Sequence, residues 1–439
     1  MRIAIFGKYP PIQGGVSSHT FWLTQALARA GHDVTVLTNA PEVEANFRET
    51  FLPGDERRLE TSGAGGSVRL VQTTDSTTYR TEYIPMASPF VSKLIGLGLR
   101  TLGDRKPDII LGWYFEPFGI AATAVGRALR LPVVIRHAGS DLARLSAHPD
   151  LRPAYQWMLK EAAGIFVGRS QGSHDVICEI MGAEPKRSLS WPLYLVPDEY
   201  YTRRRPIDLD QFAGLATAWL KRVWPGDADS HYADVQAERP VPTDTVRIVL
   251  YGKVGHSKGN IPLLRALGRL AASGRRFTFL TVSSGWLSHL REHFRELTQH
   301  AELQERTWIL PPLAPWRMRE VVAASHMACF LEHDFAIKTH APCVPYEVLA
   351  AGPCLVCSAE IWEKLIFGQA LIPEVNAIRV SNPSDVAQLE ETLRALIDDP
   401  ERAAIVGANG WRLMRSARQF LMDDATAAAH LVAQLEQCI

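Results

Sequence analysis

The amino-acid sequence predicts an α/β protein with two doubly wound, Rossmann-like domains. A chain of 439 residues is too long for a single hydrophobic core, which points to two domains. The chain also repeats itself, because residues 2–8 read RIAIFGK and residues 247–253 read RIVLYGK. A period of that length is far too long for a solenoid and indicates two βαβ domains of related design. Open parallel sheets bind ligands at the carboxyl ends of their strands, so we expect the two domains to face each other across a cleft.

Composition narrows the class of protein. Lys plus Arg and Asp plus Glu both number 47, so no net charge would recruit nucleic acid. No apolar run reaches the ~18 residues of a membrane-spanning helix, and the start, MRIAIFGKYPP, reads as a strand and turn rather than a secretory signal. Six cysteines in so long a chain argue against a disulfide scaffold. We expect a cytoplasmic protein.

The first domain is expected over residues 1–198. After a first strand at 2–6, Gly14 and Gly15 lie directly before a serine-capped helix, where they would let a ligand approach the backbone; a Gly-rich turn without a ligand would read the same way. Helical patterns separate most of the remaining candidate strands, as in a doubly wound domain. Those strands are expected at residues 34–38, 68–72, 108–113, 132–137 and 164–168.

Two polar residues follow the strand at 132–137. His137 and Asp141 are four residues apart at the carboxyl end of that strand, where chemistry is usually carried out in such sheets. Both are therefore candidate catalytic residues. The structural alternative is that Asp141 caps a helix and His137 is hydrogen-bonded in the core.

Residues 90–105 combine apolar side chains with Lys93, Arg100 and Arg105. A helix of this composition can lie on an anionic membrane surface. More often such a helix faces a protein core and keeps a solvated edge. A peripheral membrane contact therefore stays open.

The rest of the chain divides into three parts. Residues 199–245 are polar and proline-containing and read as a linker or insertion. Residues 246–410 form the second domain, with strands expected near 246–251, 277–282, 307–310, 327–331 and 354–358. Residues 411–439 are rich in Ala and Leu with helical periodicity, and we expect them to pack back on the first domain.

The loop after the strand at 246–251 carries Lys253 and Lys258 and leads into a helix. Strand, Gly- and Lys-containing loop, and helix aim backbone N–H groups and a positive dipole end at an anion. A diphosphate is the expected guest. Fixed cations would stabilise the charge that a departing nucleoside diphosphate gains in the transition state. An ordinary solvated loop is the alternative.

A second candidate site element is the segment 339–352, THAPCVPYEVLAAG. Its proline-containing loop feeds a helix with Glu347 in the first turn. A carboxylate there can accept both hydroxyls of a ribose, as acidic residues often do in nucleotide sites. It can also simply balance the helix dipole.

In sequence order, these motifs resemble glycosyltransferase family 4, whose members are retaining enzymes of the GT-B fold. The resemblance spans most of the chain apart from the linker. Four motifs carry it, and we list them with their family counterparts. They are Gly14-Gly15-Val16 for Gly-Gly-Val, His137-Ala-Gly-Ser-Asp141 for His-Gly-x-Asp, Gly252-Lys253-VGHS-Lys258-Gly259 for Gly-Arg-x4-Lys-Gly, and Glu347-VLAAG-Pro353 for the second half of Glu-x7-Glu.

The resemblance implies a role for each motif. Lys253 and Lys258 would hold the diphosphate and Glu347 the ribose hydroxyls. His137 would lie near the transferred sugar, and the Gly14-Gly15 loop would close over the phosphates or the acceptor. The family typically uses no metal ion, because the cationic side chains take its place.

Two departures from the family pattern concern the donor site. Lys253 stands where arginine is commoner, which keeps the charge but loses the planar fork. Thr339 stands at the first acidic position of Glu-x7-Glu. Glu332, Asp334 and His340 are the candidates to replace that acid, so Thr339 and His340 count as candidate donor-binding residues.

The expected function is therefore the transfer of a hexose from a UDP- or GDP-linked donor to an acceptor hydroxyl, with retention and without a metal ion or other cofactor. The acceptor is a saccharide, a lipid-linked molecule or a small natural product. A nucleotide-sugar epimerase or binding protein on the same fold is one alternative. An α/β-hydrolase is another, because Ser170 lies in GRSQG at residues 168–172, between a strand and a helix.

Two further patterns are treated as decoys. The Asp-x-Asp pairs at 208–210 and 227–229 lie in the polar linker, and the Cys354/Cys357 pair lies within an apolar strand. We expect no metal site in any of them.

Overall fold

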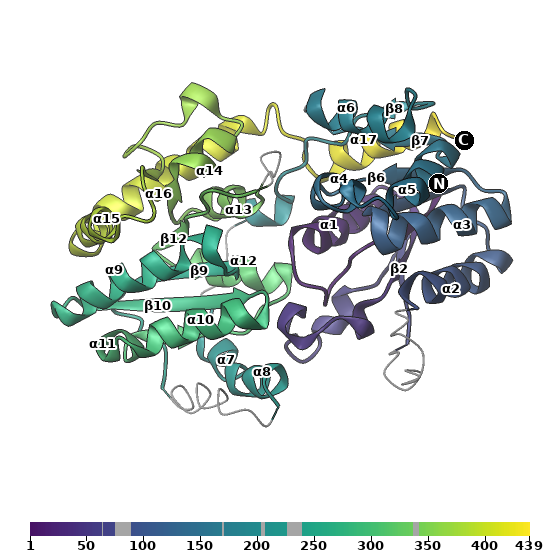
Figure 1. Ribbon diagram of the computed structural model, residues 1–439. Coiled ribbons are helices and arrows are strands. Elements are labelled where there is room, and N and C mark those ends of the chain that lie inside the picture. The colour runs from purple at the N-terminus through teal and green to yellow at the C-terminus, as the bar shows by residue number, and fades with distance from the viewer. Residues whose placement is uncertain (64, 75–88, 169–170, 203–206, 226–238, 337–341) are drawn as a thin grey trace.

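Two largely parallel β-sheets divide the chain into two domains (Figure 1). The computed structural model describes all 439 residues except 64, 75–88, 169–170, 203–206, 226–238 and 337–341. The first sheet is built from residues 2–189 and the second from residues 246–380. The prediction of an α/β protein with two doubly wound domains is confirmed.

The first sheet has the strand order β3-β4-β2-β1-β5-β6-β7-β8. Among its described strands, only the two-residue β3 runs antiparallel to its neighbour. Two short edge strands, β3 and β8, escaped the sequence analysis. The bounds are β1 Arg2–Phe6, β2 Asp33–Thr38, β3 Thr61–Ser62, β4 Ser67–Gln72, β5 Ile109–Trp113, β6 Val133–Arg136, β7 Gly164–Phe166 and β8 Ser188–Leu189.

Helices cover both faces of this sheet because its central strands are apolar on both sides. On β1, Ile3 and Ile5 are buried with α1, whereas Ala4 and Phe6 are buried with α2 and α3. The strand therefore reads as a continuous apolar run rather than an alternating one. The helices of this domain are α1 Gly15–Arg29, α2 Phe90–Asp104, α3 Ile120–Leu129, α4 Ser140–Ala143, α5 Arg152–Glu161 and α6 Gln171–Met181.

The second sheet is wholly parallel, with the order β11-β10-β9-β12-β13-β14. Every residue of β10 is buried, as expected for a strand covered on both faces. The bounds are β9 Val246–Lys253, β10 Phe277–Ser284, β11 Thr307–Ile309, β12 Met327–Phe330, β13 Cys354–Ser358 and β14 Ile378–Val380. The helices are α9 Asn260–Ala272, α10 Leu287–Thr298, α11 Ala301–Gln304, α12 Pro315–Ala324, α13 Val344–Ala351, α14 Ala359–Lys364, α15 Val386–Asp398 and α16 Pro400–Ala417.

The described part of the linker is partly helical and joins the second domain. Helices α7 (Asp210–Ala213) and α8 (Ala216–Val223) lie beside β10 and α10 (Figure 1). Trp219 and Trp224 are buried in the second domain's core, and the Trp224 ring contacts the Phe294 ring at 5.8 Å. The linker thus carries part of the core that the second domain needs.

The last helix, α17 (Asp424–Glu436), returns to the first domain and packs on α1 (Figure 1). Asp424 Oδ1 accepts hydrogen bonds from the Tyr194 hydroxyl at 2.7 Å and from the Asp198 N–H at 3.0 Å. The Met422 N–H donates to the Leu193 carbonyl at 3.0 Å. The two places where the chain crosses between the domains are therefore bonded to each other.

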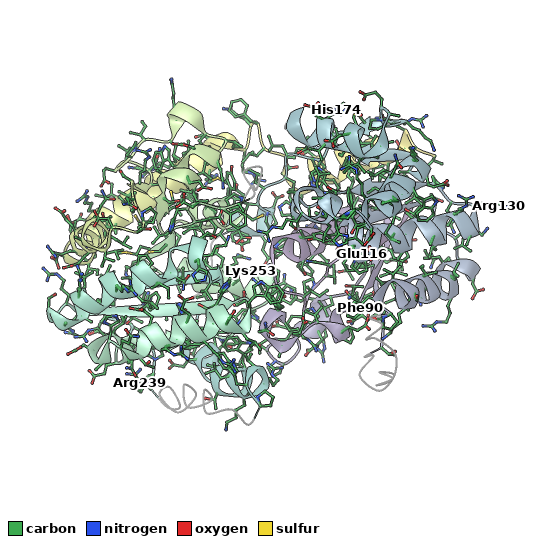
Figure 2. The ribbon with its side chains drawn as sticks, in the orientation of Figure 1. Phe90, Glu116, Arg130, His174, Arg239 and Lys253 are labelled. Carbon is green, nitrogen blue, oxygen red and sulfur yellow. The ribbon has the colours of Figure 1, made fainter. Side chains whose placement is uncertain are left out.

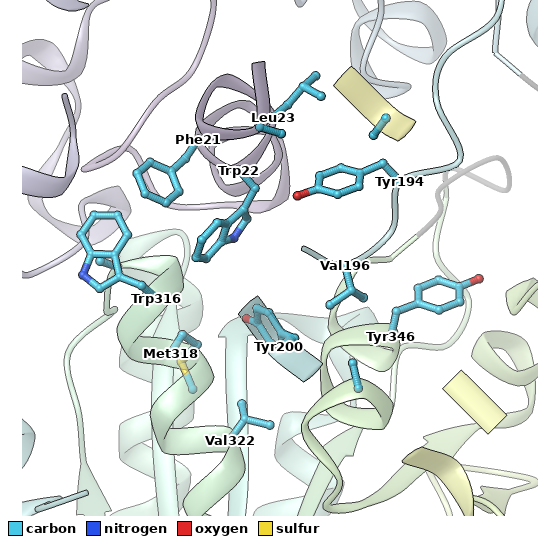
Figure 3. Packing of buried hydrophobic residues seen from close by; sticks show 14 of the residues in the cluster. Phe21, Trp22, Leu23, Tyr194, Val196, Tyr200, Trp316, Met318, Val322 and Tyr346 are labelled. Carbon is cyan, nitrogen blue, oxygen red and sulfur yellow. The ribbon is translucent and has the colours of Figure 1, made fainter. Parts of the chain in front are cut away.

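One apolar cluster is continuous across the two domains. Phe21 and Trp22 of α1 meet Trp316 and Met318 of α12, with Tyr200 of the linker between them (Figure 3). The Phe21 and Trp316 ring centroids are 4.6 Å apart. This contact closes the two domains against each other.

Polar contacts at one edge of the cleft reinforce the closed arrangement. Asp55 of the first domain is 2% exposed, and its Oδ1 accepts hydrogen bonds at 3.0 Å from Trp316 Nε1 and Arg317 Nε. At the same edge, Asn46 Nδ2 donates to the Gly285 carbonyl at 2.8 Å. We call this group of first-domain contacts, made by residues 46–55, the clasp.

Helix α2 carries the surface that the sequence left open to a membrane. Leu94, Leu97 and Leu102 are buried in the first domain, whereas Leu99 is 37% exposed. Across the described residues, no helix combines the length and the apolar character needed to cross a bilayer. A peripheral membrane contact stays a prediction.

The decoys have structural explanations where the structure describes them. Asp208 Oδ1 accepts from the Asp210 N–H at 2.9 Å, and Asp210 Oδ1 accepts from the Val241 N–H at 2.6 Å. Cys354 and Cys357 are both buried on β13, where burial raises the pKa of each thiol to about 12. Asp227, Asp229 and Ser170 lie outside the described residues.

Candidate active site

The candidate site lies between the domains, at the carboxyl ends of β1 and β9, the central strands of the two sheets. In the second domain, β9 ends at Lys253, and a short loop leads to α9. Gly259 precedes this helix with φ +68°, and a Cβ at that position would lie 2.6 Å from the Leu331 carbonyl oxygen. Asn260 holds the loop, because its Oδ1 accepts from the Gly255 N–H at 3.0 Å. Only glycine fits at 259, because the start of α9 lies directly against Leu331 at the end of β12.

Lys253 lies on the side of the second domain that faces the first (Figure 2). Its side chain is reached by water, yet atoms of both domains crowd around it, and its Nζ lies 5.7 Å from the centre of the Phe47 ring. Desolvation by these atoms, together with the charges of Lys8 and Lys258, lowers the pKa of Lys253 to about 8. Lys253 is a cation next to other cations, which favours an anionic guest.

Lys258 makes an ion pair with the buried carboxylate of Glu332. Lys364 Nζ approaches the other oxygen of Glu332 at 3.4 Å, and Lys258 Nζ lies 3.9 Å from the centre of the Phe335 ring. Glu332 therefore compensates two lysines at once. A phosphate at Lys258 would have to share that lysine with Glu332.

Glu347 lies in the first turn of α13, behind the carboxyl end of β9. Its Oε2 accepts a hydrogen bond from the Tyr251 hydroxyl at 2.9 Å. Burial raises the pKa of Glu347 to about 7, against the opposing effect of the Tyr251 hydrogen bond. The carboxylate is thus held on the cleft side of the second domain, and its charge changes near neutral pH.

The two glycines of the first domain meet the helix of Glu347 across the cleft. Gly14 has φ +129° and ends the loop before α1, in a conformation that favours glycine. A Cβ at Gly15 would lie 3.5 Å from the Sγ of Cys343, the residue directly before α13. The structure therefore places Gly15 beside the residue that precedes the helix of Glu347, and a shared site stays a prediction.

Asp141 and His137 have different surroundings. Asp141 is fully buried, and its oxygens accept hydrogen bonds from the N–H groups of Phe115 at 3.0 Å, Ala138 at 2.9 Å and Leu142 at 2.9 Å. These bonds tie the loop after β5 to the loop after β6. The contacts of Asp141 match the structural alternative, in which it shapes the loop that carries His137. A direct catalytic role for Asp141 stays a prediction.

His137 lies at the end of β6 beside the crowded backbone at Gly168. A Cβ at Gly168 would lie 3.2 Å from His137 Nε2, and among the described atoms the buried Nδ1 has no hydrogen-bond partner. Burial lowers the pKa of His137, Asp141 raises it, and Arg136 lowers it. The pKa is lowered overall, so the ring is mainly neutral near pH 7.

Thr339 and His340 lie outside the described residues. The two other candidates for the missing acid do lie within them. Glu332 is neutralised by Lys258 and Lys364, as described above, and Asp334 has a positive φ of 51°. The replacement for the first acid of Glu-x7-Glu stays unassigned.

The sequence analysis missed two cationic residues of the first domain's wall. Lys8 follows β1, and its Nζ lies 4.6 Å from the centre of the Tyr114 ring. Arg136 ends β6, where its guanidinium lies 3.3 Å from the Trp191 ring centre and 4.4 Å from that of Trp113. The repeat contained a signal for Lys8, because Lys8 and Lys253 are the last residues of RIAIFGK and RIVLYGK. Stacking on two tryptophans distant in sequence left no such signal for Arg136.

Comparisons with known proteins find a similar domain and a similar full-length sequence. Residues 14–184 match the model of the glycosyl transferase 4-like domain. The chain is 26% identical to the glycogen synthase of Mycobacterium tuberculosis over 467 aligned positions, covering 99% of this chain and 95% of that protein.

Solved structures show the same architecture. Sucrose-phosphate synthase from Thermosynechococcus elongatus superposes with a TM-score of 0.59 at 16% identity, covering 99% of this chain and 98% of the other. Alr3699/HepE from Anabaena, in complex with UDP-glucose, superposes with a TM-score of 0.60 at 14% identity, covering 99% of each chain. These likenesses confirm the predicted GT-B fold, and the domain match confirms the predicted resemblance to family 4.

Proposed function

We propose, from the premise that this chain is a glycosyltransferase of the GT-B fold with a family 4-like first domain, that it transfers a hexose from a UDP- or GDP-linked donor to an acceptor hydroxyl. The transfer retains the anomeric configuration and needs no metal ion. Retention follows from the family resemblance alone. The observation that carries the donor assignment is the pair Lys253 and Lys258 at the start of α9, with Glu347 on the neighbouring helix.

The diphosphate binds at the loop between β9 and α9. Lys253 and Lys258 supply two positive charges there, and the N-terminal end of α9 supplies N–H groups and a partial positive charge. As the bond to the sugar breaks, charge accumulates on the leaving diphosphate, and these groups stabilise it without reorganising. Cationic side chains thereby take the role that a divalent ion has in other transferases.

The ribose binds at Glu347. Its carboxylate is fixed by Tyr251, which leaves the other oxygen, Oε1, for the ribose hydroxyls. Asn46 and Thr50 of the first domain contact the ends of β10 and β11. Asn46 Nδ2 donates to the Gly285 carbonyl after β10, and the Thr50 N–H donates to the Pro312 carbonyl after β11 at 2.6 Å. The donor is therefore enclosed between the domains, where water that would hydrolyse it is excluded.

The acceptor binds against the first domain. His137 lies at the end of β6, and a Cβ at Gly14 would meet nothing within 4 Å, so the loop before α1 leaves room for a ligand. A saccharide, a lipid-linked molecule and a small natural product all offer the hydroxyl that this reaction needs. The structural relative Alr3699/HepE was crystallised with UDP-glucose, which supports a UDP-sugar as the first donor to test.

A thermal-shift panel of UDP, GDP, ADP and dTDP tests the proposal. A ligand at 100 times its dissociation constant adds about 2.7 kcal/mol of stability, so the preferred base should raise the melting temperature and the others should not. The same panel with EDTA should give the same shift. No shift with any of the four nucleotides, or a shift that EDTA abolishes, would contradict the donor assignment or the metal independence respectively. Release of the diphosphate only when an acceptor is present would separate transfer from epimerisation.

A further inference from the structure

Lys8 and Lys253 occupy corresponding positions in the two domains. Each ends the repeated segment that begins with Arg-Ile and contains Gly-Lys, RIAIFGK in one domain and RIVLYGK in the other. The strand before each lysine is central in its sheet: β1 lies between β2 and β5, and β9 lies between β10 and β12. Both lysines therefore extend from the middle of the carboxyl edge of a sheet, and the two edges face each other.

The ammonium group of Lys8 forms no ion pair within the described part of the chain. Among the described residues its recorded contact is the face of Tyr114, and no hydrogen bond or ion pair is formed there. Asp141 is the acid that raises the pKa of Lys8, but burial outweighs it and lowers the pKa overall. The oxygens of Asp141 already accept from three backbone N–H groups. Nothing described on the first domain's wall neutralises Lys8 directly.

Tyr114 holds its position independently of Lys8. Its hydroxyl shares a hydrogen bond of 2.6 Å with Ser140 Oγ, and its backbone has φ +89°, which is rare for a residue with a side chain. Such backbone outliers cluster at functional sites. The ring therefore forms a fixed support beneath a cation at the edge of the cleft.

Lys8 and Lys253 repel each other across the cleft. The charge of Lys8 lowers the pKa of Lys253, and it does so more than the charge of Lys258 on Lys253's own loop. Two cations on facing walls, with no described anion between them, favour a closed cleft only when an anion lies there.

We propose that Lys8 binds a phosphate group of a substrate on the first domain's wall, opposite Lys253. This inference rests on the proposed function. The phosphate comes either from the diphosphate of the donor, which Lys8 and Lys253 would then grip from both sides, or from a phosphorylated acceptor. In both cases the bound phosphate offsets the repulsion between the domains and so couples its binding to closure.

Isothermal titration with UDP, or with whichever diphosphate raises the melting temperature, tests the donor source. Lys8→Met keeps the length of the side chain and removes the charge, and Lys8→Arg keeps the charge. Lys160→Met, at an exposed position on α5, is the matched control. If the donor supplies the phosphate, Lys8→Met should weaken diphosphate binding about tenfold or more, because a charge-assisted hydrogen bond is worth roughly 1.5–3 kcal/mol. Lys8→Arg should recover most of that loss, and Lys160→Met should bind as the parent does.

A second titration tests the acceptor source. Inorganic phosphate is added to protein saturated with the diphosphate. If the acceptor supplies the phosphate, the parent and Lys160→Met bind inorganic phosphate and Lys8→Met does not, while diphosphate affinity stays unchanged. Circular dichroism of each variant shows that it is folded.

Lys253→Met separates this inference from the proposed function. If Lys8→Met equals the parent in both titrations while Lys253→Met loses diphosphate binding, the inference about Lys8 is wrong and the proposed function stands. If Lys253→Met also binds the diphosphate as the parent does, the proposed donor site itself is wrong.

Discussion

Replacing Glu332 with Gln should destabilise the empty protein and make a bound diphosphate more stabilising. Glu332 is 1% exposed, and its two oxygens approach Lys258 and Lys364. The amide of Gln cannot compensate an ammonium charge, so Lys258 would lose its counter-charge, whereas Lys364 would keep Glu360, whose Oε1 lies 2.7 Å from Lys364 Nζ.

The expected magnitude follows from the burial of the three groups. Breaking a buried ion pair by removing one partner costs about 3–5 kcal/mol. Here the lysine side chains remain 18% and 13% exposed, so water compensates part of the loss. We therefore expect a loss of about 2–3 kcal/mol in the free energy of unfolding, below the range for a fully buried pair.

A bound diphosphate should recover part of this loss. Its negative charge reaches Lys258, which in the parent is shared with Glu332. The stabilisation that saturating diphosphate gives should therefore be larger in Glu332→Gln than in the parent by about 1 kcal/mol, the order of one charge-assisted bond.

Urea unfolding with and without saturating diphosphate measures both effects. Glu363→Gln is the matched control, because Glu363 lies on the same helix as Lys364 and its side chain is 74% exposed, 3.9 Å from Arg379. Removing that exposed charge should change stability by less than about 0.5 kcal/mol. If Glu332→Gln is as stable as the control, or if the diphosphate stabilises it less than the parent, the reasoning about a shared Lys258 is wrong.

Four further predictions concern charge, diphosphate binding and closure. The pKa of Lys253 is lowered to about 8 in the empty protein and should rise when a diphosphate binds. Calorimetric titration with the diphosphate near pH 8, in buffers of different ionisation enthalpy, should therefore show proton uptake that Lys253→Met lacks. Equal heats in both buffers would contradict this prediction. Burial raises the pKa of Glu347 to about 7, so the folded protein holds this proton more tightly than the unfolded chain does. The free energy of unfolding should therefore fall as pH rises from about 4.5 to 7. Urea unfolding at a series of pH values should show a smaller slope for Glu347→Gln. Glu347→Ala should also weaken diphosphate binding at pH 8 without unfolding the chain, and unchanged titration would sink its assignment to the ribose. Asp55→Ala removes the acceptor of Trp316 Nε1 and one acidic partner of the 28%-exposed Arg317, which keeps Glu320 at 3.1 Å. The change should loosen the clasp, cost about 2–3 kcal/mol and raise the radius of gyration in X-ray scattering. A scattering profile equal to the parent's would show that the clasp does not hold the domains closed.

The two-domain plan and the diphosphate loop could be predicted because both depend on local sequence. Strand β9, the glycines after it and α9 follow one another within residues 246–272, so apolar runs and glycine positions reveal them. The repeat of RIAIFGK in RIVLYGK then extends the same reading to the first domain.

The partners of the candidate residues could not be predicted because they come from distant parts of the chain. Glu332 reaches Lys258 from 74 positions away, and Tyr251 reaches Glu347 from 96 positions away. Asp141 shows the limit most clearly: its spacing from His137 fits catalysis, but its three N–H donors include Phe115 from another strand end. Residue type and spacing do not report which oxygens are already occupied.

The paired crossings of the chain determine how the two halves can move. Met422 is hydrogen-bonded to Leu193, and Asp424 is hydrogen-bonded to Asp198. The two segments that connect the domains therefore lie together and form a single hinge on one side of the molecule. Rotation of the domains about this hinge moves nearby atoms little. It moves the far side of the cleft most, where Asn46 is hydrogen-bonded to Gly285. We expect the cleft to open by rotation about this hinge, with substrates entering on the side opposite the hinge.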